Sequence, residues 1–122
     1  MSTPQPYSPG SGLNSFADKP AAFARGEDSP SDYLARCLDT IAAREPEVQA
    51  WVTTRFEAAR AEAAAADRRY ADGAPLSPID GMPIAVKDVL QTRDMPTKLG
   101  SPIFENHETG FDSASVDSLR RA

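Results

Sequence analysis

Cysteine, histidine and long apolar runs are nearly absent from this sequence. Among its 122 residues, Cys37 is the single cysteine and His107 the single histidine. One cysteine cannot form a disulfide within the chain, and a lone histidine without cysteines or paired acids at ligand spacing does not predict a metal site. No apolar stretch is long enough to span a bilayer, and the N-terminus has neither the basic start nor the apolar core of a secretion signal. We therefore expect a cytoplasmic protein without a metal site or membrane contact.

Basic residues are also in the minority. The chain has 13 Lys and Arg against 18 Asp and Glu, which gives a net charge of -5. Nucleic-acid binding depends on many basic residues that neutralise phosphates, so no nucleic-acid partner is expected. The two basic doublets, Arg68-Arg69 and Arg120-Arg121, lie in helix-like stretches with acids nearby, and we interpret them as a solvated face.

The residues that are present predict one small folded domain. Hydrophobic residues make up 40% and charged residues 25% of the chain, which is ordinary for a globular protein. Residues 1 to about 15 are rich in Pro, Ser and Gly and have little to bury, so residues 1–27 are predicted to be a flexible tail and a docking segment. Residues 28–122 then form the domain.

Three helices are predicted in residues 28–122. The first begins at Ser29, a serine N-cap followed by proline, and ends at Glu45-Pro46 because proline disfavours helix in the residue before it. The second begins at Thr54, with Glu57 completing a capping box, and runs to about Ala71 before Gly73. The third begins near Asp112. The apolar stripe of the first helix consists of Tyr33, Leu34, Cys37, Leu38 and Ile41, and Val116 and Leu119 start that of the third.

A β-strand is predicted at Pro83–Leu90. This stretch is too short for a helix between its flanking breakers, and its continuous apolar, β-branched content is typical of a strand buried on both faces. The long loop that follows, residues 91–111, has room for a further short strand near Ile103. A doubly buried strand needs neighbours that this chain does not supply, so the sheet is predicted to be incomplete.

Lys87 interrupts the apolar strand. Burying an ammonium without a partner is unfavourable, so such a lysine tends to lose its proton and to become available as a general base. On spacing alone, Lys87-Asp88 more often marks the point where a strand leaves the sheet and both charges are hydrated. If the Lys87 side chain pointed freely into water and its strand lay at an open sheet edge, the enzymatic interpretation would have to be abandoned.

Residues Gly81 to Asp88, GMPIAVKD, resemble the G-[IM]-P-[IVL]-x-[VIL]-K-D stretch of the amidase signature family. Met95–Ser101 is similar to the family's M-P-T-x-x-G-S loop, and residues 112–122 are similar to its D-A-x-V-x-x-L-R-x-A helix. Upstream, the predicted helices resemble the family's N-terminal helices. The resemblance covers roughly residues 28–122, and the ordered combination is more specific than any single piece.

The resemblance implies an α/β fold in which N-terminal helices precede the first strands of a mixed sheet flanked by helices. It also implies a Ser–cis-Ser–Lys triad that hydrolyses amide bonds without a cofactor, and Lys87 matches the family's catalytic lysine. This lysine takes a proton, through a bridging serine, from the serine that attacks the amide and forms an acyl-enzyme. The implied partner is a small-molecule amide, and a homodimer of the full-length enzyme is left open.

Both serines and the oxyanion loop belong to a Gly-Gly-Ser-Ser-Gly-Gly-like segment that this sequence does not contain. Gly10-Ser11-Gly12 precedes the helices, in the wrong order for the family, and is interpreted as a linker. Residues 28–122 are thus expected to be the N-terminal part of an amidase domain, truncated before the nucleophile and inactive alone. The adjacent coding DNA should supply the Gly/Ser-rich segment.

Two alternatives stay open. The chain could be a non-catalytic interaction module that completes its sheet with another chain, or part of a protein that liberates ammonia from glutamine for transfer to charged tRNA. The residues do not specify the amide substrate. Ser101 is expected to bond its own turn, and Cys37 and Trp51 to serve packing.

Overall fold

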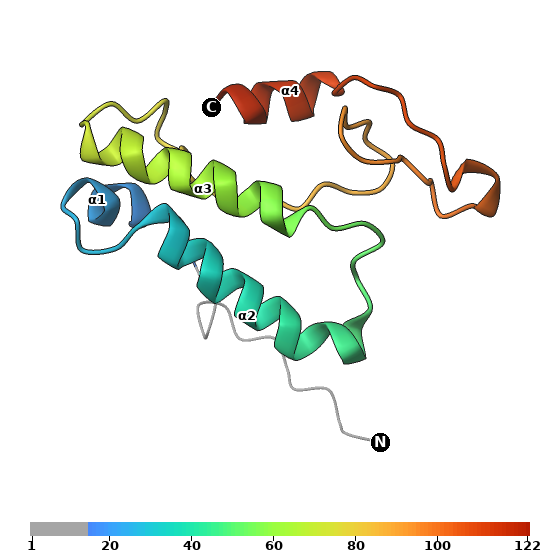
Figure 1. Ribbon diagram of the computed structural model, residues 1–122, viewed down its shortest axis with the longest axis horizontal. Coiled ribbons are helices and arrows are strands. Elements are labelled where there is room, and N and C mark those ends of the chain that lie inside the picture. The colour runs from blue at the N-terminus through green and yellow to red at the C-terminus, as the bar shows by residue number, and fades with distance from the viewer. Residues whose placement is uncertain (1–14) are drawn as a thin grey trace.

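The computed structural model describes residues 15–122, so the predicted Gly10–Gly12 linker lies outside the described residues. The elements are α1 (Lys19–Ala24), α2 (Pro30–Val48), α3 (Phe56–Ala71), a short 3-10 helix η1 (Pro102–Phe104) and α4 (Ala114–Arg121). Helices α2 and α3 pack together and run in opposite directions, α1 lies at one end of the pair, and α4 follows a long loop (Figure 1). In residues 15–122, no helix is both long and apolar enough to cross a membrane.

The start of α2 is as predicted. Ser29 is the N-cap, and its hydroxyl oxygen accepts a hydrogen bond from the backbone N–H of Asp32 at 3.1 Å. Pro30 occupies the first helical position, where its missing N–H costs nothing because that donor would have no partner in the helix. Before α2, in the segment expected to dock, Phe16 and Phe23 pack edge-to-face on Tyr33.

The predicted end of α2 at Glu45-Pro46 is wrong. The helix continues through Pro46 to Val48 and ends at Gln49, which has a left-handed φ of 52°. Glu45 explains the extension, because its carboxylate accepts the backbone N–H groups of Ala50 at 3.1 Å and Trp51 at 2.8 Å. These bonds hold the final turn closed, although proline removes one donor from it.

Helix α3 begins at Phe56 rather than Thr54, and the predicted capping box does not form. Arg55 is the N-cap residue and makes no side-chain cap bond; its guanidinium instead donates to Glu62 at 2.8 Å. The C-terminus agrees with prediction. Gly73 follows the helix with a φ of 67°, a conformation that glycine adopts without steric cost.

Two apolar clusters hold the helices together. Phe23, Tyr33 and Tyr70 join α1, α2 and α3, with Cys37 packed beside them. Leu34, Leu38 and Ala63 join α2 and α3, with Ile41, Phe56 and Ala59 against them. The stripe predicted for the first helix is therefore divided between both clusters, and Trp51 packs edge-to-face on Phe56, as expected of a packing residue.

The predicted strand at residues 83–90 does not form. Residues 15–122 contain no β-strand, only an isolated bridge between Thr92 and Met95, so the described part of the fold is helix-rich. Ile84 is 43% exposed and Val89 51% exposed, in contrast to the burial predicted on both faces. A strand is stable only when neighbouring strands pair with its N–H and C=O groups, and no described segment pairs with the backbone of residues 83–86.

A second prediction is wrong in the loop after this segment. The short strand expected near Ile103 is the helix η1, because Ser101 caps its start and proline follows in the first position. The serine oxygen accepts the N–H of Ile103 at 3.4 Å, which confirms that Ser101 bonds its own turn.

Candidate active site

The candidate site begins where the chain leaves α3. Asp80 is 3% exposed, and its carboxylate accepts from Arg69 Nε at 2.7 Å and Nη2 at 2.6 Å. The hydroxyl of Tyr70 donates to the carbonyl oxygen of Asp80 at 3.0 Å. The hydrogen bonds from Arg69 hold the pKa of the Asp80 carboxyl below its usual range, against the opposing effect of burial. Together these contacts fix the chain directly before the GMPIAVKD stretch.

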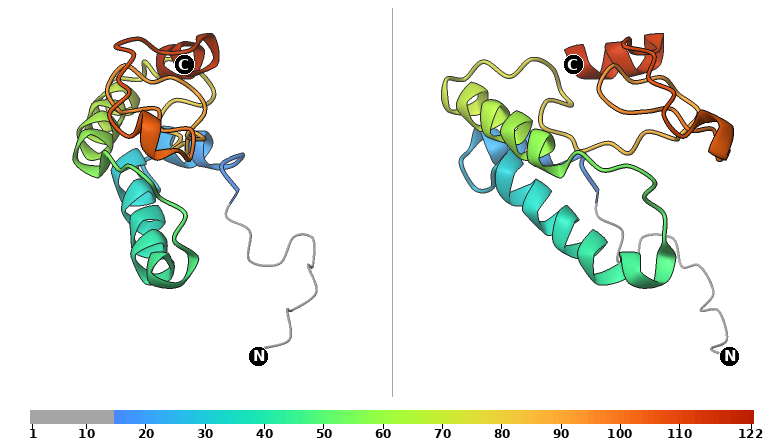
Figure 2. Two further views of the ribbon diagram at one scale, coloured as in Figure 1. Left: turned by 90° about the vertical axis from the view of Figure 1, so that its right-hand side faces the viewer. Right: turned by 45° about the vertical axis from the view of Figure 1, so that its right-hand side comes forward.

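From Gly81 the chain runs extended along an open cleft of about 1020 Å³. Apolar side chains predominate in its lining: Leu38 and Ile41 from α2, Phe56 and Ala63 from α3, Met82, Ile84 and Val86 from the extended segment, and Val116 and Leu119 from α4. The two views in Figure 2 show this connection passing between the α2/α3 pair and α4. The cleft thus separates the helical pair from the C-terminal part.

Lys87 lies on the lining of this cleft, at the end of the extended segment. Its side chain is exposed, and its ammonium has no ion pair or hydrogen bond with residues 15–122. The dry environment predicted for Lys87 is therefore absent from the described part of the chain. Within the described part of the chain, the side chain of Lys87 is therefore open to solvent.

The loop that resembles M-P-T-x-x-G-S lies directly beside Lys87. The carbonyl oxygen of Asp88 accepts the N–H of Leu99 at 3.1 Å, and its carboxylate Oδ1 accepts the N–H of Lys98 at 2.7 Å. Two segments that the resemblance identified separately are thus in direct contact. Among the described residues, no hydrogen bond joins the side chains of Ser101 and Lys87.

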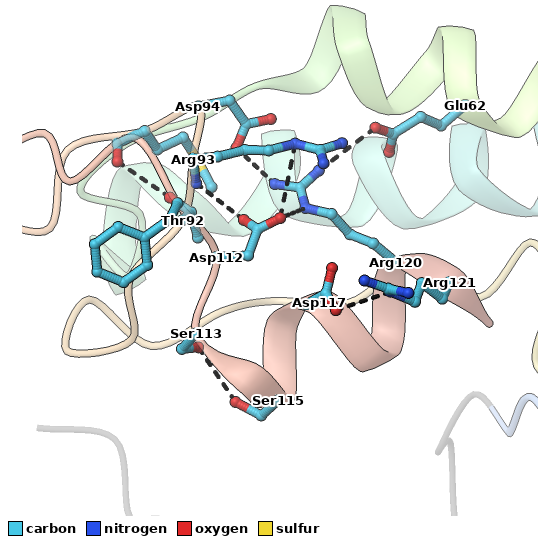
Figure 3. Close-up of polar contacts among 12 residues, drawn as sticks. Glu62, Thr92, Arg93, Asp94, Asp112, Ser113, Ser115, Asp117, Arg120 and Arg121 are labelled. Carbon is cyan, nitrogen blue, oxygen red and sulfur yellow. Dashed lines mark hydrogen bonds and ion pairs between the residues drawn. The ribbon is translucent and has the colours of Figure 1, made fainter.

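A charged network joins the turn after Asp88 to α3 and α4 (Figure 3). Arg120 Nη2 donates to Asp94 at 2.6 Å, and its Nε lies 3.0 Å from Oδ2 of Asp112. The side chain of Asp112 is only 4% exposed, and its Oδ1 accepts the N–H of Arg93 at 2.9 Å. Arg55 adds a further ion pair to Asp94 at 2.9 Å.

This network corrects the prediction for the basic doublets. Arg68 and Arg121 are exposed, but Arg69 pairs with buried Asp80, and Arg120 is 17% exposed between two acids. The sequence offered only weak signals for these pairs, because the acids of the Arg120 network come from loops without periodicity. Each doublet thus has one hydrated arginine and one that holds the fold together.

The remaining candidates carry no chemistry in this structure. The ring of His107 packs edge-to-face on Phe104, and within residues 15–122 no three His, Cys, Asp or Glu side chains are grouped to hold a metal ion. Cys37 is partly buried beside the aromatic cluster, and this burial raises the pKa of its thiol.

Comparisons with known proteins agree with this arrangement. Two curated relatives are glutamyl-tRNA(Gln) amidotransferase subunits, one from Oleidesulfovibrio alaskensis, 43% identical over 102 residues, and one from Salinispora arenicola, 41% identical over 108 residues. These matches cover 84% and 88% of this chain but 20% and 22% of the relatives. The chain therefore spans about a fifth of the length of the curated relatives it matches.

Solved structures are similar as well. One is described as an unexpected vestigial protein complex that reveals the evolutionary origins of an s-triazine catabolic enzyme. It superposes with a TM-score of 0.80 at 31% identity, covering 88% of this chain and 24% of that chain. Its inhibitor-bound form gives a TM-score of 0.82 at 32% identity. Residues 32–122 match the Amidase family, and this match over most of the sequence establishes that the chain belongs to the amidase family.

Proposed function

We propose that this chain contributes the catalytic base, Lys87, of an amidase that hydrolyses carboxylic amide C–N bonds through an acyl-enzyme. The observation that carries the proposal is the GMPIAVKD stretch, which lies within the residues matched to the Amidase family and contains Lys87, a residue of the cleft lining. In this proposal the nucleophilic and bridging serines come from sequence outside these 122 residues.

The proton balance of the proposed reaction is simple. As the nucleophilic serine oxygen bonds to the amide carbon, its proton passes through the bridging hydroxyl to the amine of Lys87. The same proton returns to the amide nitrogen as the C–N bond breaks, which leaves an acyl-enzyme and a free amine or ammonia. Water then attacks the ester with Lys87 again as base, and the carboxylic acid leaves. No metal or organic cofactor is required.

The exposed position of Lys87 has to change for this chemistry. We propose that residues 83–87 become a strand of a mixed sheet when the rest of the domain is present, and that its strands fill the apolar cleft. The unpaired extended backbone and the exposed side chains of Ile84, Val89 and Leu90 support this proposal. Removal of water from around the amine then favours its neutral, proton-accepting form.

The relatives suggest which amide is the substrate. Both curated proteins described above belong to glutamyl-tRNA(Gln) amidotransferases, so the side-chain amide of glutamine, which yields ammonia, is the substrate we propose to test first. Simple carboxamides are the second choice, because the part of the chain in hand contains no side chain that selects between them.

A chimera tests the proposal. Residues 1–122 are joined to the part of the Oleidesulfovibrio alaskensis relative that follows its matched region, since that region is only 20% of the relative. Ammonia release from glutamine is measured for this chimera, for Lys87→Ala and for the matched control Lys19→Ala, whose lysine lies on α1. Activity in the chimera and the control, with loss in Lys87→Ala, is the expected result. Near-normal turnover of Lys87→Ala would refute the assignment.

A second function is favoured by the same unpaired segment. The 122-residue chain could act as a non-catalytic module that completes its sheet with another polypeptide, with Lys87 merely structural. Size-exclusion chromatography of the purified chain separates the two ideas. A stable, folded, discrete oligomer favours the interaction module, whereas a partly unfolded or aggregating monomer favours the piece of an enzyme.

A further inference from the structure

The backbone on the two sides of Lys87 is held very differently. Among the described residues, the N–H groups of residues 84–86 and the C=O groups of residues 83–86 have no hydrogen-bond partner. The carbonyl oxygen of Lys87, in contrast, accepts from the N–H of Val89 at 2.7 Å and of Leu90 at 3.0 Å. The backbone is therefore held by hydrogen bonds from Lys87 onward, whereas residues 83–86 before it are not held in this way.

Asp88 accepts the hydrogen bonds that join this fixed point to a distant segment of the described chain. Its main-chain and side-chain oxygens accept from Leu99 at 3.1 Å and Lys98 at 2.7 Å, ten or more positions along the chain. Both donors are consecutive residues of one tight turn, which the N–H of Ser101 closes by donating to the carbonyl oxygen of Lys98 at 3.0 Å. One residue thus holds the turn at two points.

The turn itself is sterically unusual. Its two central residues, Leu99 and Gly100, have φ values of 54° and 65°, as in type I′ turns. Asparagine and glycine tolerate this conformation, whereas a leucine with its Cβ is disfavoured there. A strained leucine persists only where surrounding contacts over-determine it, and the two acceptors of Asp88 are contacts of that kind.

The same junction contains two buried polar atoms without partners. Oδ2 of Asp88 and the hydroxyl oxygen of Thr97 are inaccessible to water and have no hydrogen bond with the described residues. Thr97 is only 3% exposed. Burying a carboxylate with one oxygen unsatisfied is unfavourable. We therefore interpret Asp88 as a residue that holds the neighbouring turn in position, rather than one that adds to the stability of the fold.

We propose that Asp88 is a positioning residue: its two oxygens lock the left-handed turn Lys98–Ser101 against the end of the extended segment and thereby fix the main chain that carries Lys87. The inference rests on the proposed function in one respect, namely that Lys87 is the base. The lock itself does not depend on that role. Leu99 is the strained element of the turn, and without the side-chain contact to Lys98 only the main-chain oxygen of residue 88 holds the turn, so Leu99 moves away.

The lock is tested by hydrogen exchange in the chimera, measured by mass spectrometry on peptides that cover residues 97–101. Asp88→Ala is expected to raise exchange in these peptides, and Asp88→Asn, which keeps one acceptor oxygen, to raise it less. Leu99→Gly added to Asp88→Ala should restore part of the protection, because glycine adopts the positive φ without strain, although the acceptor for the Lys98 N–H stays absent. The control Asp117→Ala removes an acid that pairs with Arg121 on α4 and should change nothing here. Unchanged exchange in Asp88→Ala would overturn the lock.

Positioning is tested separately by steady-state kinetics in the same chimera. Asp88→Ala is expected to lower kcat by about 10²-fold with little change in KM, since small misplacements of a catalytic group have effects of that order. Recovery of kcat in Asp88→Ala/Leu99→Gly would separate loss of positioning from loss of fold. Normal kcat in Asp88→Ala, with Lys87→Ala inactive, refutes positioning and leaves the proposed function intact. Full activity of Lys87→Ala, with exchange altered in Asp88→Ala, refutes the function and leaves the lock.

Discussion

Gly81 lies so close to Pro30 that a Cβ atom on the glycine would be 2.9 Å from Cγ of the proline and 3.0 Å from its Cβ. Pro30 is fully buried at the start of α2, so it has no free space to move into. Gly81 also has a φ of 81°, which disfavours any residue with a side chain. This contact holds the start of the extended segment close against the first residue of α2.

Gly81→Ala is therefore expected to lower the free energy of unfolding by roughly 2–4 kcal/mol, as the sum of overpacking and backbone strain. Urea denaturation of the chimera measures this change. Gly26→Ala is the matched control, because Gly26 has a similar φ of 68° but nothing within 4 Å of its added Cβ. It should cost only about 1 kcal/mol, the strain alone. Equal losses for both variants would show that the proline contact is unimportant.

Local signals in the sequence predicted the helices better than their ends. The serine cap and proline at Ser29-Pro30 are sufficient to start α2, because both act on neighbouring backbone groups. The continuation past Pro46 depends on Glu45 reaching the N–H groups of Ala50 and Trp51, a contact that no helical period reveals. The start of α3 was missed for a similar reason, since Arg55 is engaged with Glu62 and Asp94.

The pair between Asp80 and Arg69 makes stability depend on pH. Because the pKa of Asp80 is lowered in the folded chain, the unfolded chain binds more protons in the range below about pH 4, where a free aspartate titrates. The free energy of unfolding should then rise with pH through this range, and the contribution of the pair should be lost as pH falls through the folded pKa. Denaturation curves collected between pH 2 and pH 7, on the order of one pH unit apart, measure the slope.

Asp80→Asn should flatten this slope and destabilise the chain by about 3 kcal/mol at neutral pH, since it leaves the guanidinium of Arg69 without its charge partner. Some slope will remain, because hydrogen bonds from Arg36 also lower the pKa of Asp28. Glu57→Gln provides the control: Glu57 is 92% exposed in its pair with Arg60, so its loss should change stability by less than about 1 kcal/mol. A slope in Asp80→Asn as steep as that of the unchanged chain would contradict the assignment.

The site was only partly accessible from sequence. The GMPIAVKD stretch located Lys87, because a motif is a local pattern of letters. The burial of this stretch could not be predicted from the motif in the same way. Burial of a strand depends on partner strands, and none occurs among the residues that the structure describes, so Ile84 and its neighbours remain exposed. The contacts of Asp88 with Lys98 and Leu99 were likewise invisible, because they join residues far apart in the chain.

Val86→Pro should have different effects on the stability of the 122-residue chain and of the chimera, in which we propose that residues 83–87 form a strand. The N–H of Val86 has no partner in residues 15–122, and the segment is already extended, so Val86→Pro should change the stability of the purified chain by less than about 1 kcal/mol. In the chimera, where we propose that this N–H pairs with a neighbouring strand, the same change should cost about 2 kcal/mol by leaving a buried carbonyl unsatisfied. Thermal unfolding of both proteins provides the comparison. Equal, small effects would argue against a strand at residues 83–87.

Arg120 and Arg121 are adjacent in α4 but should respond very differently to substitution. The Arg120 side chain is 17% exposed and lies between Asp94 and Asp112, whereas that of Arg121 is 78% exposed and pairs only with Asp117 among the described residues. Arg120→Ala leaves the carboxylate of Asp112, which is 4% exposed, without its closest cation. We expect a loss of about 3 kcal/mol, the typical cost of breaking a buried ion pair from one side.

The loss should be local before it is global, because α4 is joined to the rest of the chain mainly through this network and the buried side chain of Val116. Hydrogen exchange in Arg120→Ala should therefore increase first in residues 112–121 and in the turn that contains Asp94, while α2 and α3 keep their protection. Arg121→Ala should leave exchange in these segments unchanged, since an exposed pair contributes at most about 1 kcal/mol. If both variants exchange alike, the network is not what holds α4 in place, and its attachment comes instead from Val116 and from the hydrogen bonds that join Ser113 to Gln91 and Ser77 to Ala122.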